Sequence, residues 1–267
     1  MTKLRSAIFG HAIGDALGLP VQFRPRDSFH ITGMTGYGTF NMPSGSWSDD
    51  TSMTIATCDS IRINLGKVDP ADIFKRFEDW YHRDFYTPFG QAYDIGRTTS
   101  AAMRAREGQG DYWSNGNGSL MRILPLAFTD ADDALIEEVS ALTHAHKISR
   151  KACVIYIRIA RALINDDQYG LTYPEPFHRL ENIASLEREE IKSSGFVVDS
   201  LEAAVWCLLT TDSYSECVLK AVNLGDDTDS IAAIAGGLAG IKYGFDTIPT
   251  DWLDALQAKD VIESCLF

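Results

Sequence analysis

The sequence contains no run of 18 apolar residues and no Cys-x-x-Cys pair. The first absence predicts that no helix crosses a membrane. The cysteines are odd in number and at least three lie within apolar helical patterns, so we expect buried free thiols of a reducing compartment. The N-terminal residues also lack the apolar stretch of a signal peptide, and a cytoplasmic protein is expected. The five cysteines are Cys58, Cys153, Cys207, Cys217 and Cys265.

Positive charge is scarce: the formal net charge is −13. This balance argues against direct nucleic-acid binding and against anionic membrane surfaces. It does not exclude an anionic substrate, because bound cations can reverse the field locally. With 45% hydrophobic residues and only 9 prolines in 267 residues, the chain is globular. No internal repeat or charged linker divides it, so we predict one compact domain over residues 1–267, and we expect a monomer.

Clean alternation of apolar and polar residues over six positions is absent, which excludes most strands. Apolar residues recur instead at helical spacing, and the sequence predicts an all-α fold. Asp69-Pro70 is a typical N-cap followed by proline, and it predicts a helix that ends near Trp80. An amphipathic helix is expected over residues 3–17. Further helices are expected over residues 120–128, 148–163, 200–210, 215–224 and 228–243.

Residues 24–47 show no clear helical or strand pattern. A loop of this length is usually functional or disordered. We expect either a lid or wall near a functional site, or a plain excursion of the chain.

Two acidic clusters, Ser-Asp-Asp-Thr at residues 48–51 and Asp-Asp-Thr-Asp-Ser at residues 226–230, each open an apolar helical segment. Together they offer five carboxylates and four hydroxyls. Hard oxygen ligands of this kind suit Mg²⁺ or Mn²⁺ rather than Zn²⁺. If the fold brings the clusters face to face, they can hold two cations that activate water. Taken singly, each cluster is also compatible with an ordinary helix cap.

Three other features have a functional and a structural interpretation. The glycine-rich segment at residues 115–119 can present backbone N–H groups to a phosphate, or it can be a simple turn. Asp94 can orient water or receive a proton, or it can cap the next helix. His144 can contact a ligand, or it can make a structural hydrogen bond near a helix end.

Five motifs in order make the sequence resemble the ADP-ribosylglycohydrolase family, which includes the dinitrogenase-reductase-activating glycohydrolase. They are Gly-Asp-Ala-Leu-Gly-Leu-Pro at 14–20, Ser-Asp-Asp-Thr at 48–51, Asp-Ile-Gly-Arg-Thr-Thr at 94–99, Asn-Gly-Asn-Gly-Ser-Leu-Met-Arg at 115–122 with Thr-His at 143–144, and Gly-Asp-Asp-Thr-Asp-Ser at 225–230. Each motif alone is weak evidence, but chance agreement of all five in order is very improbable.

The resemblance implies an all-α fold with a two-metal cleft. The implied metal ligands are Ser48, Asp49, Asp50, Asp227, Asp229 and Ser230. The implied catalytic groups are Asp49, Asp50, Asp94 and Gln22. The implied substrate contacts are Gly116, Asn117, Gly118, Ser119 and His144. Asp226 lies outside the ligand set.

One position departs from the family pattern. Gln22 stands where the family usually has a Glu associated with the metal site. An amide oxygen can ligate a cation, but it cannot accept a proton near neutral pH. The substitution puts the acid–base group or full activity in doubt, but not the fold.

The resemblance implies a metal-dependent hydrolase that uses two divalent cations, Mg²⁺ or Mn²⁺, to cleave the C1″ glycosidic bond of an ADP-ribosylated protein or small molecule. ADP-ribosyl-arginine is the favoured substrate, with serine, O-acetyl, polymer or nucleic-acid acceptors as alternatives. A catalytically silent ADP-ribose binder, or a structural protein similar to the family's lens crystallins, is the other hypothesis. A two-metal phosphohydrolase that releases phosphate or AMP is a more distant one.

Overall fold

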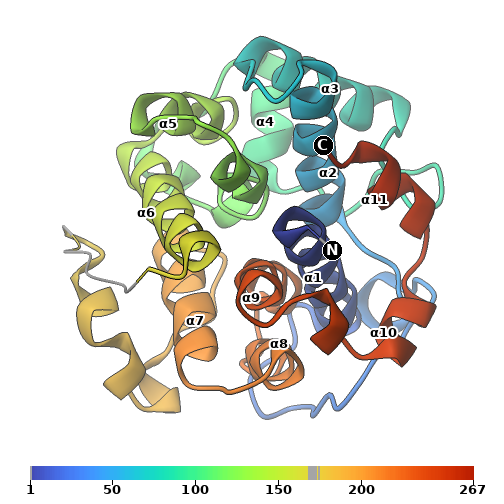
Figure 1. Cartoon of the computed structure of the whole chain (residues 1–267), viewed down its shortest axis with the longest axis vertical. Helices are drawn as coiled ribbons and strands as arrows, with labels where there is room; N and C mark the ends of the chain where they lie inside the picture. Colours follow the sequence, from blue (N-terminus) through green and yellow to red (C-terminus); the bar gives the residue numbers. More distant parts are fainter. Residues whose placement is uncertain (1, 168–172, 174) are drawn as a thin grey trace.

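The computed structural model describes residues 2–167, 173 and 175–267. Within them the chain is mostly helical and forms isolated β-bridges but no strand, which confirms the all-α prediction (Figure 1). The α-helices are α1 (Lys3–Gly18), α2 (Asp49–Ile63), α3 (Pro70–Arg83), α4 (Arg97–Ala105), α5 (Asp133–Ala141), α6 (Lys147–Asn165), α7 (Val197–Leu209), α8 (Tyr214–Val222), α9 (Thr228–Tyr243), α10 (Thr250–Ala255) and α11 (Lys259–Cys265).

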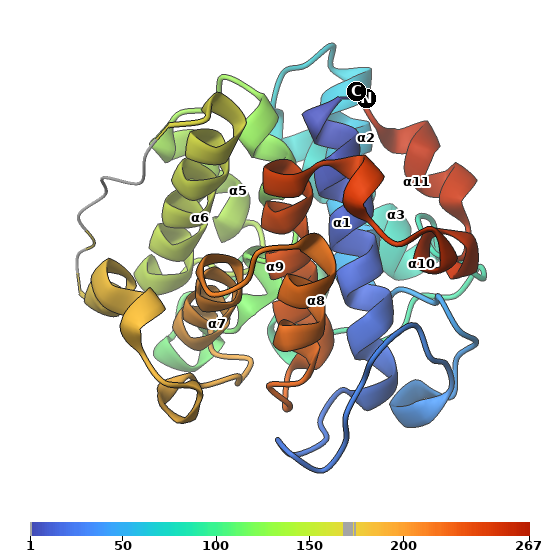
Figure 2. The same cartoon turned by 60° about the horizontal axis from the view of Figure 1, so that its bottom comes forward.

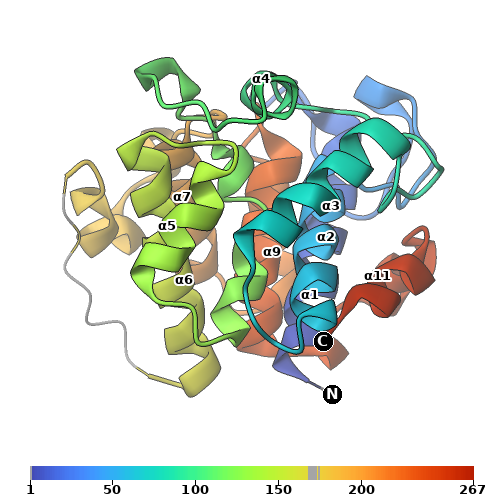
Figure 3. The ribbon, with the colours of Figure 1, turned by 90° about the horizontal axis from the view of Figure 1, so that it is seen from above.

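Local sequence signals explain several helix boundaries. The Asp69 side chain accepts hydrogen bonds from the backbone N–H groups of Ala71 and Asp72, and Pro70 occupies the first helical position of α3. The helix continues past Trp80 to Arg83, where Asp84 adopts a left-handed conformation and ends it. Helix α9 occupies the range that its apolar pattern predicts. Helix α3 packs across α2 (Figure 3).

Helices α1 and α9 lie side by side at the centre of the molecule (Figures 1 and 2). Glycine makes this close approach possible, because it has no Cβ. A Cβ on Gly14 would lie 2.0 Å from the carbonyl oxygen of Ala232, and one on Gly18 would lie 2.4 Å from the Cα of Asp229. The C-terminal end of α1 is therefore fixed against the first turn of α9, where the second acidic cluster begins.

Residues 3–17 form the expected helix, but the expectation that this helix is amphipathic is wrong. In α1, 14 of the 16 residues are buried. The reason is that α1 is covered on several sides, by α9, α8, α2 and α11. Its N-terminal end also contacts α11, where Nε of Arg5 lies 2.9 Å from a carboxylate oxygen of Glu263.

Residues 120–128 do not form the single helix that was expected. Within this range the chain makes a 3-10 segment at Leu124–Phe128, and a separate one, Asn117–Ser119, lies just before it. Pro125 lies within the expected range. Because proline lacks an N–H group and clashes with the preceding turn, it prevents a continuous α-helix at this point.

The loop at residues 24–47 is attached to the rest of the molecule by side-chain hydrogen bonds. The Arg26 guanidinium donates to the carbonyl oxygens of Leu224 at 2.7 Å, Arg188 at 2.9 Å and Ile191 at 2.6 Å. The hydroxyl of Thr39 donates to the carbonyl oxygen of Gln22 at 2.7 Å. The loop therefore supports the segments that precede the second acidic cluster and the backbone of Gln22.

The structure also tests the expectations about the cysteines and about membrane-spanning helices. All five cysteines are free and buried, as predicted. Among the described residues, no helix has the length and apolar character that would let it cross a membrane.

Candidate functional site

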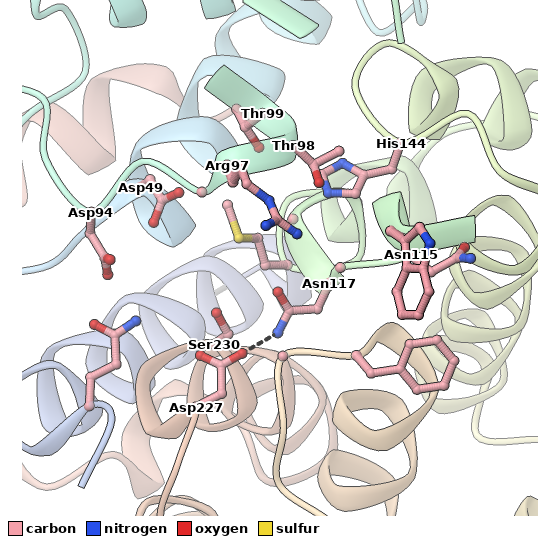
Figure 4. Close-up of a pocket in the computed structure, with 18 of the residues that line it drawn as sticks. Asp49, Asp94, Arg97, Thr98, Thr99, Asn115, Asn117, His144, Asp227 and Ser230 are labelled. Carbon is pink, nitrogen blue, oxygen red and sulfur yellow. Dashed lines mark hydrogen bonds between the residues drawn. The ribbon is translucent and has the colours of Figure 1, made fainter. Parts of the chain in front are cut away.

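A cleft of about 550 Å³ opens where the two acidic clusters meet (Figure 4). Its walls come from the chain just after α1, the first turns of α2 and α4, the glycine-rich turn at residues 115–118, the segment before α7 and the first turn of α9. The acidic side chains Asp49, Asp94 and Asp227 lie toward one end, and His144 and Asn115 lie toward the other. The cleft is therefore chemically asymmetric along its length.

The first cluster is positioned by a buried carboxylate, Asp15 of α1. One of its oxygens accepts from the backbone N–H of Thr51 at 3.0 Å and from the Thr51 hydroxyl at 2.6 Å. The carboxylate also accepts from the backbone N–H of Ser48 at 2.9 Å and from the Ser48 hydroxyl at 3.0 Å. Asp15 thus satisfies free N–H groups at the start of α2 and fixes the direction of Asp49 and Asp50.

The two clusters are in direct contact. The hydroxyl of Ser230 in α9 donates to Oδ2 of Asp50 in α2 at 3.2 Å. The Asn117 amide donates to Oδ2 of Asp227 at 2.6 Å and to the hydroxyl of Ser200 at 2.9 Å. The glycine-rich turn is therefore joined to the second cluster through Asn117, and the segments that the sequence motifs single out converge on one cleft.

Burial and mutual repulsion perturb these carboxyl groups. Burial raises the pKa of Asp49, Asp50 and Asp229 well above the usual aspartate value, and nearby carboxylates add to the rise. Burial also raises the pKa of Asp94 to about 7, and the neighbouring Gln22 amide opposes that rise. The same amide opposes the upward shift in the pKa of Asp227. Like charges thus crowd the floor of the cleft.

Several oxygen atoms at the cleft floor are buried without a hydrogen-bond partner in the described part of the chain. They are Oδ1 of Asp50, both carboxylate oxygens of Asp229, Oδ2 of Asp94 and Oε1 of Gln22. A buried oxygen normally has a partner, so this group has unused acceptor capacity that suits a hard divalent cation. Within the described residues, no three His, Cys, Asp or Glu side chains stand ready-made as a metal-binding group. The two-metal site therefore stays a prediction.

Most of the predicted site residues line the cleft: Gln22, Asp49, Asp94, Gly116, Asn117, Gly118, His144, Asp227 and Ser230. Ser48, Asp50 and Asp229 are buried beside it. Ser119 is not among the lining residues, because its hydroxyl faces the core, where it accepts from the Ser140 hydroxyl at 2.9 Å and lies 3.5 Å from the Cys153 sulfur. Helix α4 has no side-chain cap, so Asp94 is not the helix cap that the structural interpretation suggested. None of residues 24–47 lines the cleft, so the loop is not its wall.

Asp15, Arg97 and the aromatic residues of the cleft were not predicted from the sequence as functional residues, although Asp15 and Arg97 lie within two of the motifs. Phe23, Tyr112, Trp113 and Phe196 line it, and the side chain of Trp113 is 82% exposed. Phe23 has a φ of 66°, which is unusual for a bulky residue. The available signal for Asp15 was an acidic residue within an otherwise apolar helix. Tyr112 and Trp113 adjoin the glycine-rich motif.

Without divalent cations, we expect the stability of the protein to fall as the pH rises from about 4 to about 7. The pKa of Asp15 is raised from 3.8 to about 6, and that of Asp94 from 3.8 to about 7. The pKa values of Asp49, Asp50 and Asp229 are also raised, so the raised carboxyl groups outnumber His11 and His144, whose pKa values burial lowers to about 4 and about 3. In this window the folded protein therefore binds more protons than the unfolded chain, and the stabilisation by these carboxyl groups is complete below their unfolded pKa and is lost as the pH passes their folded pKa. Calorimetric melting in EDTA measures the change. Asp94→Asn should flatten the upper part of the profile, and a wild-type stability that increases through the window would contradict the prediction.

Comparison with known proteins agrees with this arrangement. A family model described as ADP-ribosylglycohydrolase matches residues 1–266. An ADP-ribosylarginine hydrolase of Serratia proteamaculans is 33% identical over 99% of this chain and 78% of its own. The ADP-ribosyl-dinitrogen reductase glycohydrolase of Rhodospirillum rubrum is 30% identical over 95% of this chain and 90% of its own. A solved structure described as an ADP-ribosylglycohydrolase-related protein complex superposes with a TM-score of 0.81 at 29% identity, covering 98% of this chain and 95% of the other. The chain therefore belongs to the ADP-ribosylglycohydrolase family, as its five motifs predict.

Proposed function

We propose that this protein is a metal-dependent hydrolase that cleaves the C1″ glycosidic bond of ADP-ribosylated acceptors and releases ADP-ribose. The observation that carries the proposal is the contact between the two acidic clusters through Ser230 and Asp50, at the floor of a cleft with unpartnered carboxylate oxygens. Family membership supplies the reaction class. The relatives named above act, by their names, on ADP-ribosylarginine and on ADP-ribosyl-dinitrogen reductase.

The side chains that would hold the cations are those of the two clusters: Ser48, Asp49, Asp50, Asp227, Asp229 and Ser230. Their oxygens are hard ligands, and negative charge is concentrated there. Bound divalent cations would supply the positive charge that positions the ribose hydroxyls and a water molecule. We propose two cations, Mg²⁺ or Mn²⁺, which would remove the mutual repulsion of these carboxylates.

The other end of the cleft suits the ADP part of the substrate. Arg97 lines it and has no ion-pair or hydrogen-bond partner among the described residues, and in Figure 4 its guanidinium points into the cleft. An arginine of this kind is free to bind a pyrophosphate oxygen. Gly116 and Gly118 keep the neighbouring backbone accessible, and the rings of Tyr112 and Trp113 offer faces for a base. The substrate would thus lie with its distal ribose over the acidic clusters.

In the proposed reaction the oxygen of a water molecule bonds to C1″ while the bond from C1″ to the acceptor nitrogen or oxygen breaks. A cleft carboxylate, Asp49, Asp50 or Asp94, accepts the proton that the water loses, and the departing acceptor gains one. A carboxyl group with a pKa near neutrality can exchange protons efficiently, and the pKa of Asp94 is raised to about 7. Gln22, as an amide, would orient a hydrogen-bonding partner without taking part in proton transfer.

The first candidate acceptor is arginine. The Serratia relative is named for ADP-ribosylarginine. Phe23 supports the choice, because its side chain is 65% exposed at the acidic end of the cleft and can stack on a planar guanidinium.

The test of the proposal is a mass-spectrometric release assay. Purified protein with Mg²⁺ or Mn²⁺ should release ADP-ribose from an arginine-linked substrate, and from serine-linked and O-acetyl substrates more slowly. Phosphate or AMP as the product would indicate a phosphohydrolase. Tight binding of ADP-ribose without any release from the three substrates would indicate a silent binder.

ADP-ribose should raise the melting temperature of the metal-loaded protein, because a ligand that prefers the native state stabilises it by mass action. At a ligand concentration of 100 Kd the expected stabilisation is about 2.7 kcal/mol. EDTA should reduce the shift, since the cations would hold the ribose. Thermal melts with AMP in place of ADP-ribose serve as the control. An equal shift with and without EDTA would mean that the cations do not contact the ligand.

A further inference from the structure

His144 is almost completely buried, and one edge of its ring lies against the glycine-rich turn. A Cβ on Gly118 would lie 2.7 Å from its Cε1 and 3.1 Å from its Nε2, and one on Gly116 would lie 3.6 Å from Nε2. The ring lines the cleft at this edge (Figure 4). Its Nε2 atom has no hydrogen-bond partner among the residues that the structure describes. The opposite ring nitrogen, Nδ1, points into the protein.

A chain of buried hydrogen bonds reaches Nδ1 of His144 from the interior. The Arg122 guanidinium donates through Nη2 to the Thr143 hydroxyl at 2.9 Å, and that hydroxyl lies 2.8 Å from Nδ1 of His144. Arg122 and Thr143 are both 0% exposed. Arg122 makes no ion pair with a carboxylate in the described part of the chain. It also donates to the carbonyl oxygen of Val139 at 3.1 Å and stacks on the ring of Phe77, 4.5 Å from its centroid.

The hydrogen-bond partners of the Thr143 hydroxyl determine which nitrogen of His144 carries the proton. A guanidinium is always a donor, so the Thr143 oxygen accepts from Arg122. Nδ1 of His144 is the other hydrogen-bond partner of that oxygen among the described residues. If Nδ1 carried a proton, the Thr143 hydrogen would be buried without an acceptor, which is costly. If Nδ1 is bare, the Thr143 hydrogen is donated to it, and both the hydroxyl and Nδ1 are satisfied. The proton of a neutral His144 then resides on Nε2.

We infer that Arg122 and Thr143 act as positioning residues that fix His144 as a neutral Nε2–H donor to an anionic phosphate oxygen in the cleft. The inference rests on the proposed function, because ADP-ribose supplies that oxygen. His144 is on this view a substrate-binding group and not a proton carrier. The charge of the Arg122 guanidinium, which no carboxylate balances, adds a positive potential behind the turn that favours an anion.

The electrostatic surroundings agree with a neutral ring. Burial, together with the nearby positive charge of Arg122, lowers the pKa of His144 to about 3. The pKa of Arg122 is itself lowered by burial to about 10, which leaves it charged at neutral pH. The Cys153 thiol, near Arg122 and Ser119, has a raised pKa because of burial and stays protonated.

Nitrogen-15 NMR of histidine-labelled protein tests the tautomer directly, with His144→Gln used to assign the signal. The wild type should show a protonated Nε2 and a bare Nδ1 at neutral pH and at pH 5. Thr143→Val removes the hydroxyl and should produce a mixture of tautomers, whereas Thr143→Ser should restore the wild-type signal. In calorimetry, Thr143→Val should bind ADP-ribose about tenfold more weakly than the wild type, and Thr143→Ser within about twofold of it.

Kinetic measurements on an arginine-linked substrate should show KM raised and kcat nearly unchanged in Thr143→Val, and both values close to those of the wild type in Thr143→Ser. A protonated Nδ1 in the wild type would overturn the inference, whether or not the variants fold. So would a Thr143→Ser variant that is as impaired as Thr143→Val, since that would indicate loss of packing alone. Failure of the wild type to bind ADP-ribose would refute the proposed function and the phosphate contact, while the NMR signal would still decide the tautomer.

Discussion

Replacement of Asp227 by Asn should lower kcat/KM for the release of ADP-ribose at least about 100-fold. The substitution keeps the shape of the side chain, and its carbonyl oxygen can still accept the hydrogen bond that Asn117 donates at 2.6 Å. What it removes is the negative charge of a proposed metal ligand. Changes in residues that only support a metal ligand already cost about 10–100-fold in affinity or activity, so loss of the charged ligand itself should cost more. Calorimetric titration with Mn²⁺ and the release assay measure the two effects.

The neighbouring Asp226 provides a matched control. It is exposed, its carboxylate accepts from the Ser193 hydroxyl at 3.3 Å, and it does not line the cleft. Asp226→Asn removes the same charge from the adjacent position and should keep activity and Mn²⁺ affinity within about twofold of the wild type, because an exposed charge outside the site interacts weakly with it. A comparable loss in both variants would mean that the general negative field, and not ligation, is responsible.

Stability distinguishes loss of a ligand from misfolding. The pKa of Asp227 is raised by burial, which means that its charged form is disfavoured in the metal-free protein. Asp227→Asn should therefore melt at a higher temperature than the wild type in EDTA while having lost its activity. An inactive variant that melts at a lower temperature in EDTA would contradict the assignment of Asp227 as a ligand and favour a structural role.

Gln22→Glu should move the half-maximal concentration of Mg²⁺ or Mn²⁺ for activity about tenfold lower. Gln22 is 5% exposed, lines the cleft and has an unpartnered Oε1. A carboxylate at this position adds a negative charge near the proposed cations. Two unit charges about 4 Å apart interact by about 4 kcal/mol at an effective dielectric constant of about 20, so a tenfold effect, about 1.4 kcal/mol, survives considerable desolvation. Turnover at saturating metal should be unchanged or higher.

Without metal, Gln22→Glu should be less stable than the wild type, although it should bind the metal more tightly. The Gln22 amide now opposes the rise in the pKa of Asp94 and Asp227, and a glutamate would replace that amide by a like charge. Gln22→Glu should therefore melt at a lower temperature than the wild type in EDTA and at an equal or higher temperature with Mn²⁺. Gln22→Asn, which stays neutral, is the control and should not lower the activation midpoint. An unchanged midpoint in Gln22→Glu would mean that this side chain only shapes the cleft.

Local sequence signals predicted several of the helices and most of the residues that line the cleft. Proline after Asp69 and the apolar pattern after Asp227 encode the starts of α3 and α9 locally, because caps and periodicity act over a few residues. Asp49, Asp94, Asp227 and His144 were recognisable as candidates, and the cleft includes all four. The single helix expected over residues 120–128 does not form. The residue that argues against it, Pro125, is also a local signal.

Tertiary structure decided how the candidates meet. No sequence pattern states that Gly18 brings the end of α1 against Asp229, that Asp15 fixes the start of α2, or that Ser230 donates to Asp50. These contacts join residues far apart in the chain, and they depend on which side chains the packed core leaves room for. The same holds for α1, whose sequence pattern indicated an amphipathic helix but which neighbouring helices bury on several sides. Ser119 matches its motif and yet faces the core, because side-chain direction is set by packing around the turn and not by the order of residues.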